Sequence, residues 1–125
     1  MSGLTLDSGA LIALDRNDRR VIALLARARE IGARITLPAT ALAQAIRHPS
    51  KQARLSRLAR QPETEIVPLD GADATRVGLL LAARRTADVV DAHVVICARR
   101  NAQPIVTSDP DHLAHLDPEA RLIVV

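Results

Sequence analysis

Aspartates border three apolar stretches of the chain, and their spacing would allow metal-assisted chemistry. Asp7 interrupts the apolar run GLTLDSGALIAL, and Asp109 ends the segment IVTSD. Asp88 and Asp91 stand three residues apart in TADVVDAHVV, so both fall on one side at the start of a helix. Converging carboxylates repel one another, and Mg²⁺ or Mn²⁺ would relieve that repulsion because these ions prefer carboxylate oxygen. Such a site can hold a phosphodiester for attack by an activated water.

Each of these aspartates also fits a plain structural role at the start of a helix. Asp7 fits the cap of the short helix that follows it, and Ser8 is a second candidate for that cap. Asp88 fits the cap of the next apolar helix, and Asp109 precedes a proline, as a helix cap often does. The chemical interpretation depends on all of them arriving at one end of the same sheet.

Short strands and longer segments of helical period alternate along the chain and must position these side chains. Strands are predicted at residues 4–6, 34–37, 65–69, 103–109 and 121–125. Helices are predicted at residues 8–14, 39–48, 51–60, 87–100 and 109–116, with two more between Asn17 and Gly32 and from Asp70 onward. This alternation predicts an α/β fold: a mainly parallel five-stranded sheet with helices on both faces, a three-layer α/β/α sandwich. If the first and fourth strands are neighbours, Asp7 and Asp109 face each other across the crevice at the strand ends.

The composition predicts one domain over residues 1–125, with a core of aliphatic side chains. Apolar residues make up 48% of the sequence, but Phe, Trp and Tyr are absent. The single cysteine, Cys97, excludes an internal disulfide and a cysteine-based zinc site. No apolar run approaches the length of a membrane span and no signal peptide is recognisable, so we expect a cytoplasmic protein.

The charge balance favours a polyanionic partner. The formal net charge is +3, almost all of the positive charge comes from arginine, and Lys51 is the only lysine. Candidate RNA-binding residues lie in one amphipathic segment: Arg47, Lys51, Arg54 and Arg57. A solvated helix face explains the same pattern without RNA. Because aromatic rings are absent, RNA recognition would depend on phosphates, arginine planes and backbone groups.

Four segments taken in order carry a resemblance that covers essentially the whole chain. They are LDSGALIAL, LPATALAQAIR, DVVDAHVVICA and IVTSDPDHL. This ordered set resembles a PIN domain, and in particular the VapC-type toxin ribonucleases of toxin–antitoxin pairs. The resemblance implies a metal-dependent endoribonuclease that uses Mg²⁺ or Mn²⁺, a homodimer, and a small antitoxin whose tail covers the active site. It also implies that Asp7, Asp91 and Asp109 hold the metal.

The resemblance assigns roles to further residues and breaks at one position. Thr107 matches the hydroxyl residue that positions a carboxylate or a water, and the group around the metal ligands would include Asp88, Ser108 and Asp111. Gln44 stands where the family usually has a catalytic glutamate. Glutamine is isosteric but uncharged, which weakens metal affinity and removes a general base.

Three alternatives therefore stay open beside the nuclease. The first is a catalytically weak PIN-like module that binds RNA or protein. The second is a signalling domain of the same fold class, which lacks support because no lysine is suitably placed. The third is a zinc site at His112 and His115, although the short helix predicted there would expose both side chains. His93 and Cys97 fit interior positions.

Overall fold

The computed structural model describes residues 3–125, and its centre is a five-stranded parallel sheet. The strands are β1 (Gly3–Leu6), β2 (Arg34–Pro38), β3 (Thr64–Val67), β4 (Ile105–Thr107) and β5 (Leu122–Val124). They lie in the order β3-β2-β1-β4-β5, and every neighbouring pair is parallel. The predicted fold class is thereby confirmed. The side chains of β1 and β4 are buried throughout, whereas the edge strands β3 and β5 are partly exposed, as expected for a parallel sheet covered on both faces.

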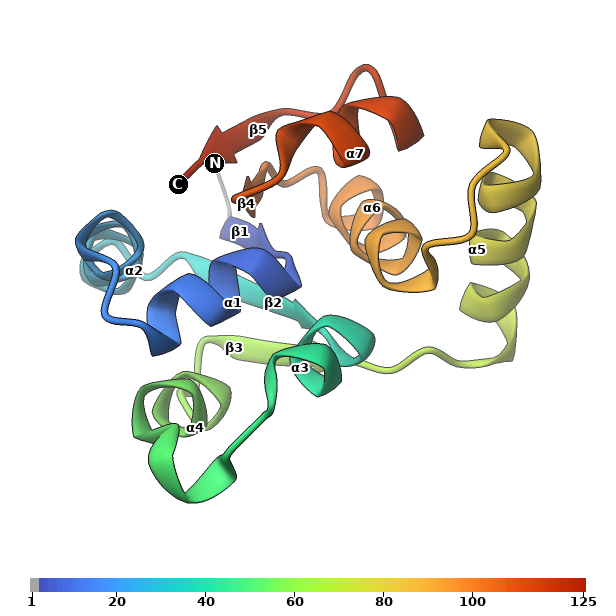
Figure 1. The fold of residues 1–125 in the computed structure, drawn as a ribbon. Coiled ribbons are helices and arrows are strands. Elements are labelled where there is room, and N and C mark those ends of the chain that lie inside the picture. Colours follow the sequence, from blue (N-terminus) through green and yellow to red (C-terminus); the bar gives the residue numbers. More distant parts are fainter. Residues whose placement is uncertain (1–2) are drawn as a thin grey trace.

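Seven α-helices and one short 3₁₀ helix connect these strands within the described chain. They are α1 (Ser8–Asp15), α2 (Arg19–Glu30), α3 (Ala39–Ala45), the 3₁₀ helix η1 (Pro49–Lys51), α4 (Ala53–Ala59), α5 (Gly71–Arg84), α6 (Val89–Asn101) and α7 (Pro110–Leu116). Helix α1 packs against α2, α3 and α4, while α5, α6 and α7 pack against one another. Figure 1 shows α2 and α4 on one side of the sheet and α5 and α6 on the other. None of the helices in residues 3–125 combines the length and the apolar character needed to cross a membrane.

The sequence predicts Asp7 or Ser8 as the cap of the first helix and Asn17 as the cap of the second, and the structure confirms only Asp7. The cap of α1 is Asp7 rather than Ser8, because the Asp7 carboxylate accepts a hydrogen bond from the Ala10 amide. The cap of α2 is Asp18 rather than Asn17. Asn17 instead adopts the left-handed conformation at φ 65°, which asparagine tolerates better than most residues.

The helix predicted over residues 39–48 ends early, at Ala45, because a buried side chain replaces its next hydrogen bonds. The amide oxygen of Gln52 accepts bonds from the Arg47 and His48 amides, at 2.9 and 3.1 Å. Its nitrogen donates to the carbonyl of Ala45 at 2.9 Å. The chain therefore turns before α4, which begins two residues later than predicted. The predicted strands 65–69 and 103–109 are also shorter in the structure, because proline lies beside each of them.

The core consists of aliphatic side chains, as the composition requires. Leucine, isoleucine, valine and alanine from β1, β2, β4 and all helices except α5 form one buried cluster. Cys97 and His93 lie inside α6 with no exposed surface, so their predicted interior placement is confirmed. Burial raises the pKa of the Cys97 thiol to about 12, which makes it an inert packing group.

Candidate active site

The site begins where the order of the strands reverses. Strands β1 and β4 are neighbours in the sheet although about a hundred residues separate them in sequence, and the Asp7 amide donates to the Val106 carbonyl at 3.2 Å. Asp7 follows β1 directly and Asp109 follows β4 after one intervening residue. The expected adjacency of the first and fourth strands is confirmed. Two aspartates therefore share the rim of the sheet where ligands of open α/β folds bind.

Asp7 is buried, with 4% of its surface exposed, and it carries two roles at once. Its Oδ1 accepts the Ala10 amide at 2.8 Å, which caps α1. Burial raises the pKa of the Asp7 carboxyl, and the charge of Asp109 raises it further. Hydrogen bonds from the Thr107 hydroxyl and from the amides of Ala10 and Gly9 act in the opposite direction without cancelling the rise. The aspartate predicted to hold a metal is therefore also the cap of α1.

Asp91 lies in the first turn of α6, half-buried, and responds to charges on both sides. Asp88 caps this helix, and its Oδ1 accepts the Asp91 amide at 2.9 Å. Burial, then the charge of Asp88, then the charge of Asp7 raise the pKa of Asp91 to about 6. The influence of Asp7 places Asp91 at the same rim, so β1 and α6 deliver carboxylates toward one another.

Thr107 links the two strand ends. Its side chain is fully buried, and its Oγ1 accepts the Asp109 amide at 2.8 Å while its hydroxyl hydrogen-bonds the Asp7 carboxylate. A single hydroxyl thus ties the backbone of Asp109 to the side chain of Asp7. Thr107 thus has the contacts that a residue positioning a carboxylate would need.

Asp109 is the exposed member of the group, with 58% of its side chain accessible. Its Oδ2 lies 2.8 Å from Nδ1 of His112, one turn along α7. Their spacing of three residues in the sequence is the signal for this pair, because such residues are neighbours on a helix. His115 bonds the Arg84 carbonyl instead, at 2.8 Å, so the two histidines do not act together as a zinc site. Asp111 is exposed in the first turn of α7.

A glycine allows the two loops of the rim to approach closely. A Cβ atom on Gly9 would lie 2.2 Å from the Ser108 Oγ and 3.4 Å from the Asp7 Oδ1. Ser108 stands between Thr107 and Asp109, so contact between Gly9 and Ser108 brings the β4–α7 loop against the start of α1. The contact between Gly9 and Ser108 could not be predicted from the sequence, because the two residues are far apart along the chain.

Gln44 lies exposed on α3, which packs against α6. It follows Thr40 by four residues and therefore shares its face of the helix. The Thr40 hydroxyl lies 2.7 Å from Nδ1 of buried His93, which ties that face of α3 to the helix carrying Asp91. The Nε2 of His93 has no hydrogen-bond partner among the described residues.

The donor set suits a hard cation, although its members do not form a closed cage. Within residues 3–125, no three His, Cys, Asp or Glu side chains lie close enough together to make a ready metal site. Burial and the charge of Asp109 nevertheless raise the pKa of Asp7. Burial and the charges of Asp88 and Asp7 raise the pKa of Asp91, against the opposing charge of His112. Oxygen donors in this state gain from Mg²⁺ or Mn²⁺, which accept waters in the remaining positions.

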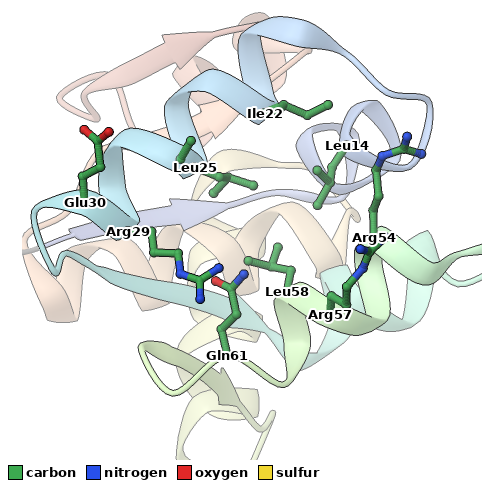
Figure 2. Close-up of a pocket in the computed structure, with 10 residues that line it drawn as sticks. Leu14, Ile22, Leu25, Arg29, Glu30, Arg54, Arg57, Leu58 and Gln61 are labelled. Carbon is green, nitrogen blue, oxygen red and sulfur yellow. The ribbon is translucent and has the colours of Figure 1, made fainter.

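The predicted basic segment faces a different part of the molecule. Arg54 and Arg57 line a cavity of about 670 Å³ between α2 and α4. Its other walls include Leu14, Leu25 and Leu58, and none of the rim aspartates borders it (Figure 2). Arg47 and Lys51 are exposed near the turn before α4. These four residues therefore do not line the acidic rim.

Comparison with protein families gives one result over almost the whole chain. A family model described as PIN domain matches residues 4–117. No curated protein matches the chain.

Proposed function

Because the chain belongs to the PIN domain family, whose fold is that of nucleases, we propose that it is a metal-dependent endoribonuclease of the VapC toxin type. The observation that carries this proposal is the pair of carboxylates at the rim. Asp7 follows β1 and Asp91 lies in the first turn of α6. Both have raised pKa values, although the charge of His112 acts in the opposite direction on Asp91. Carboxyl groups with perturbed pKa values concentrate at functional sites.

The residues that would hold Mg²⁺ or Mn²⁺ are Asp7, Asp91 and Asp109. A cation bound there supplies an activated water and offsets charge on the phosphate. Asp109 is exposed and directly precedes α7, so its carboxylate is open to an incoming ligand. Binding at carboxylates with raised pKa values also releases protons.

The surrounding residues position these oxygens. Thr107 donates its hydroxyl to Asp7 and accepts the amide of Asp109, which limits how far the two strand ends can separate. Asp88 holds the first turn of α6, and so fixes the backbone of Asp91. Gln44 brings an amide to the same face of α3 as Thr40, where it can hold a water or a substrate oxygen without adding charge.

RNA cleavage in Mn²⁺ or Mg²⁺ tests the proposal. Asp7→Asn and Asp91→Asn each remove a charged donor, and each should lower the cleavage rate by about 100-fold or more. Asp73→Asn is the matched control, because Asp73 is an equally buried aspartate in α5 that belongs to an ion cluster away from the rim. Equal activity of the wild type and both rim variants would overturn the proposal.

A binding module that does not cut RNA is the second candidate, and Gln44 is the observation that favours it. The variant Gln44→Glu restores a carboxylate at this position. If the nuclease proposal is right, it raises both Mn²⁺ affinity in calorimetry and the cleavage rate. Absence of Mn²⁺ binding in both forms, together with retained RNA binding, would favour the binding module.

The VapC assignment extends to partners. We propose a homodimer and a cognate antitoxin protein that covers the acidic rim. Sedimentation of the purified chain measures the first. A short neighbouring reading frame for a DNA-binding protein, whose product blocks cleavage when co-expressed, would support the second, and a product without effect on cleavage would contradict it.

A further inference from the structure

A second cavity begins at the acidic rim and follows one face of α1. Its volume is about 430 Å³. The residues that line it are Gly9, Ile12, Ala13, Arg16, Asp18, Ser108 and Val125. Four of them recur at the three- and four-residue spacing that places side chains on one face of a helix. The cavity is therefore a groove with α1 as one wall and the strand ends of β4 and β5 opposite.

One end of the groove lies beside the acidic rim, because a Cβ on Gly9 would lie 3.4 Å from the Asp7 Oδ1. Gly9 lies two residues after Asp7, and Ser108 lies directly before Asp109. These two residues also contact each other, because the Ser108 hydroxyl occupies the space where a Cβ of Gly9 would lie. A strand bound at the carboxylates would therefore enter the groove beside the contact between Gly9 and Ser108.

The far end of the groove carries a cation. Arg16 is exposed at the end of α1, and no ion pair or side-chain hydrogen bond involves it within residues 3–125. Asp18, the acidic residue nearby, is already engaged. Its Oδ1 accepts the amides of Arg20 and Val21 at 2.9 and 3.2 Å, and its Oδ2 lies 3.6 Å from the Arg20 guanidinium. Arg16 therefore remains available for an anion.

The walls between the two ends are apolar. Ile12 and Ala13 are half-buried on α1, and Val125 lies opposite them. The Val125 amide donates a hydrogen bond to the Thr107 carbonyl at 2.9 Å, which fixes its position. This combination of an apolar wall and a terminal guanidinium matches a nucleotide, which has a flat base, a ribose and a charged phosphate. It suits a peptide less well, because the described walls offer few polar groups to an extended backbone.

We infer that this groove binds the single RNA strand that continues from the acidic rim, with a backbone phosphate on Arg16 and a base and ribose against Ile12, Ala13 and Val125. The inference rests on the proposed nuclease function and names a substrate subsite for it. Nine residues separate Asp7 from Arg16, which is roughly 13 Å along a helix. A stacked strand advances about 3.4 Å per nucleotide, so the phosphate on Arg16 is not the one at the rim but lies further along the strand.

The test measures RNA binding in a chain that does not cleave. In the Asp91→Asn background, Arg16→Gln is compared with Arg34→Gln, an exposed arginine at the start of β2, the end of the sheet opposite the rim. The probes are a dinucleotide and a labelled single strand of about ten nucleotides, followed by fluorescence anisotropy at several salt concentrations. Thermal unfolding of each variant checks that the fold is retained.

We expect Arg16→Gln to weaken binding of the longer strand about five- to tenfold, and to lower the slope of log affinity against log salt by about 0.7. Dinucleotide binding and the Arg34→Gln variant should stay unchanged. Equal effects of the two arginine variants, or an equal loss for both probes, would overturn the groove assignment. If Arg16→Gln has no effect while the wild type cleaves RNA, the groove assignment alone fails, and sedimentation then tests whether a second copy occupies the groove. If the wild type neither binds nor cleaves RNA, both proposals fail.

Discussion

Two aspartates of this protein are equally buried and experience opposite electrostatics. Asp7 at the rim has 4% of its surface exposed, and Asp73 in α5 has 2%. Asp73 accepts a bond from Arg76 at 2.9 Å and a second one from Arg100 of α6. These arginines, Arg100 first, hold the pKa of Asp73 below its usual range, whereas burial and Asp109 push the pKa of Asp7 above it.

The difference separates a carboxylate that the protein compensates with arginines from one that it does not. The charge of Asp73 is compensated by the protein itself, and the cluster joins α5 to α6. The charge of Asp7 is compensated only by hydrogen bonds, although removing a carboxylate from water without a counterion is costly. A cation that binds beside Asp7 would offset this desolvation cost and so stabilise the folded state. For this reason we expect a metal at the rim and none at Asp73.

The largest predicted effect is stabilisation by a divalent cation. At a Mn²⁺ concentration a hundred times the dissociation constant, the wild type should gain about 2.7 kcal/mol of unfolding free energy. Asp73→Asn should show the same gain. Asp7→Asn and Asp91→Asn should lose most of it, because each removes a charged donor. Thermal unfolding with and without Mn²⁺ measures this, and an equal gain in all four proteins would remove the distinction between the two regions.

Neutralising the two buried aspartates should change stability in different ways. Asp73→Asn weakens two charge-assisted hydrogen bonds and should cost about 1–2 kcal/mol. Asp7→Asn keeps the helix cap, because asparagine caps as well as aspartate, and it removes repulsion at the rim. Without metal, Asp7→Asn should therefore be neutral or slightly stabilising in urea unfolding. A loss as large as that of Asp73→Asn would show that Asp7 serves the fold more than the site.

The dependence of stability on pH should also distinguish the regions. The pKa of Asp91 is about 6 in the folded chain and near 3.8 in the unfolded chain, so the folded state holds more protons between these values. The unfolding free energy of the protein should then fall by about 1 kcal/mol as pH rises from about 4 to about 6. This figure allows for solvent screening, because the Asp91 carboxylate is half-exposed. Asp73 has a lowered pKa, so its contribution is present above its unfolded pKa and is lost as pH falls through the folded value.

Metal-free urea unfolding across this pH range provides the measurement. Asp91→Asn should remove the fall in stability, and Asp73→Asn should leave it in place. A fall that persists in Asp91→Asn at full size would assign it to another group, with Asp7 the first candidate because its pKa is raised as well.

The sequence predicts the fold better than it predicts either aspartate's surroundings. Apolar patterns locate the five strands and the seven α-helices of residues 3–125, because burial on both faces of a parallel sheet requires them, but they miss the 3₁₀ helix η1. The strand order is a tertiary property, so the contact between the ends of β1 and β4 is only an assumption until the structure is seen. Asp73 illustrates the same limit: Arg76 lies one turn away on its helix, but Arg100 is 27 residues distant and pairs with it only after α5 packs on α6.

In the candidate site, too, some features can be predicted from the sequence and others depend on tertiary contacts. Asp7, Asp91 and Asp109 can be proposed from their positions at the starts of helices. The nearness of Asp7 and Asp109 follows once β1 and β4 are neighbours. The bond from Gln52 that ends α3 early could not be predicted, because it requires a loop to fold back on the helix. The approach of Ser108 to Gly9 is likewise a contact between segments about a hundred residues apart in sequence.

The smallest predicted effect concerns the close contact between Gly9 and Ser108. This contact belongs to the rim and has no counterpart in the Asp73 cluster. Gly9→Ala should stabilise a helix by up to about 1 kcal/mol, but the new Cβ meets the Ser108 Oγ at 2.2 Å and forces this hydroxyl to rotate. In a Ser108→Ala background the oxygen is absent, and the helical gain should return. A double-mutant cycle in urea should therefore give a coupling energy of about 0.5–1 kcal/mol between the two positions. In the same cycle, Gly9→Ala alone should lower the Mn²⁺ affinity, and adding Ser108→Ala should restore it. Additive effects on both quantities would show that the loop after β4 is free to move from α1, and that the rim aspartates are brought together by Thr107 alone.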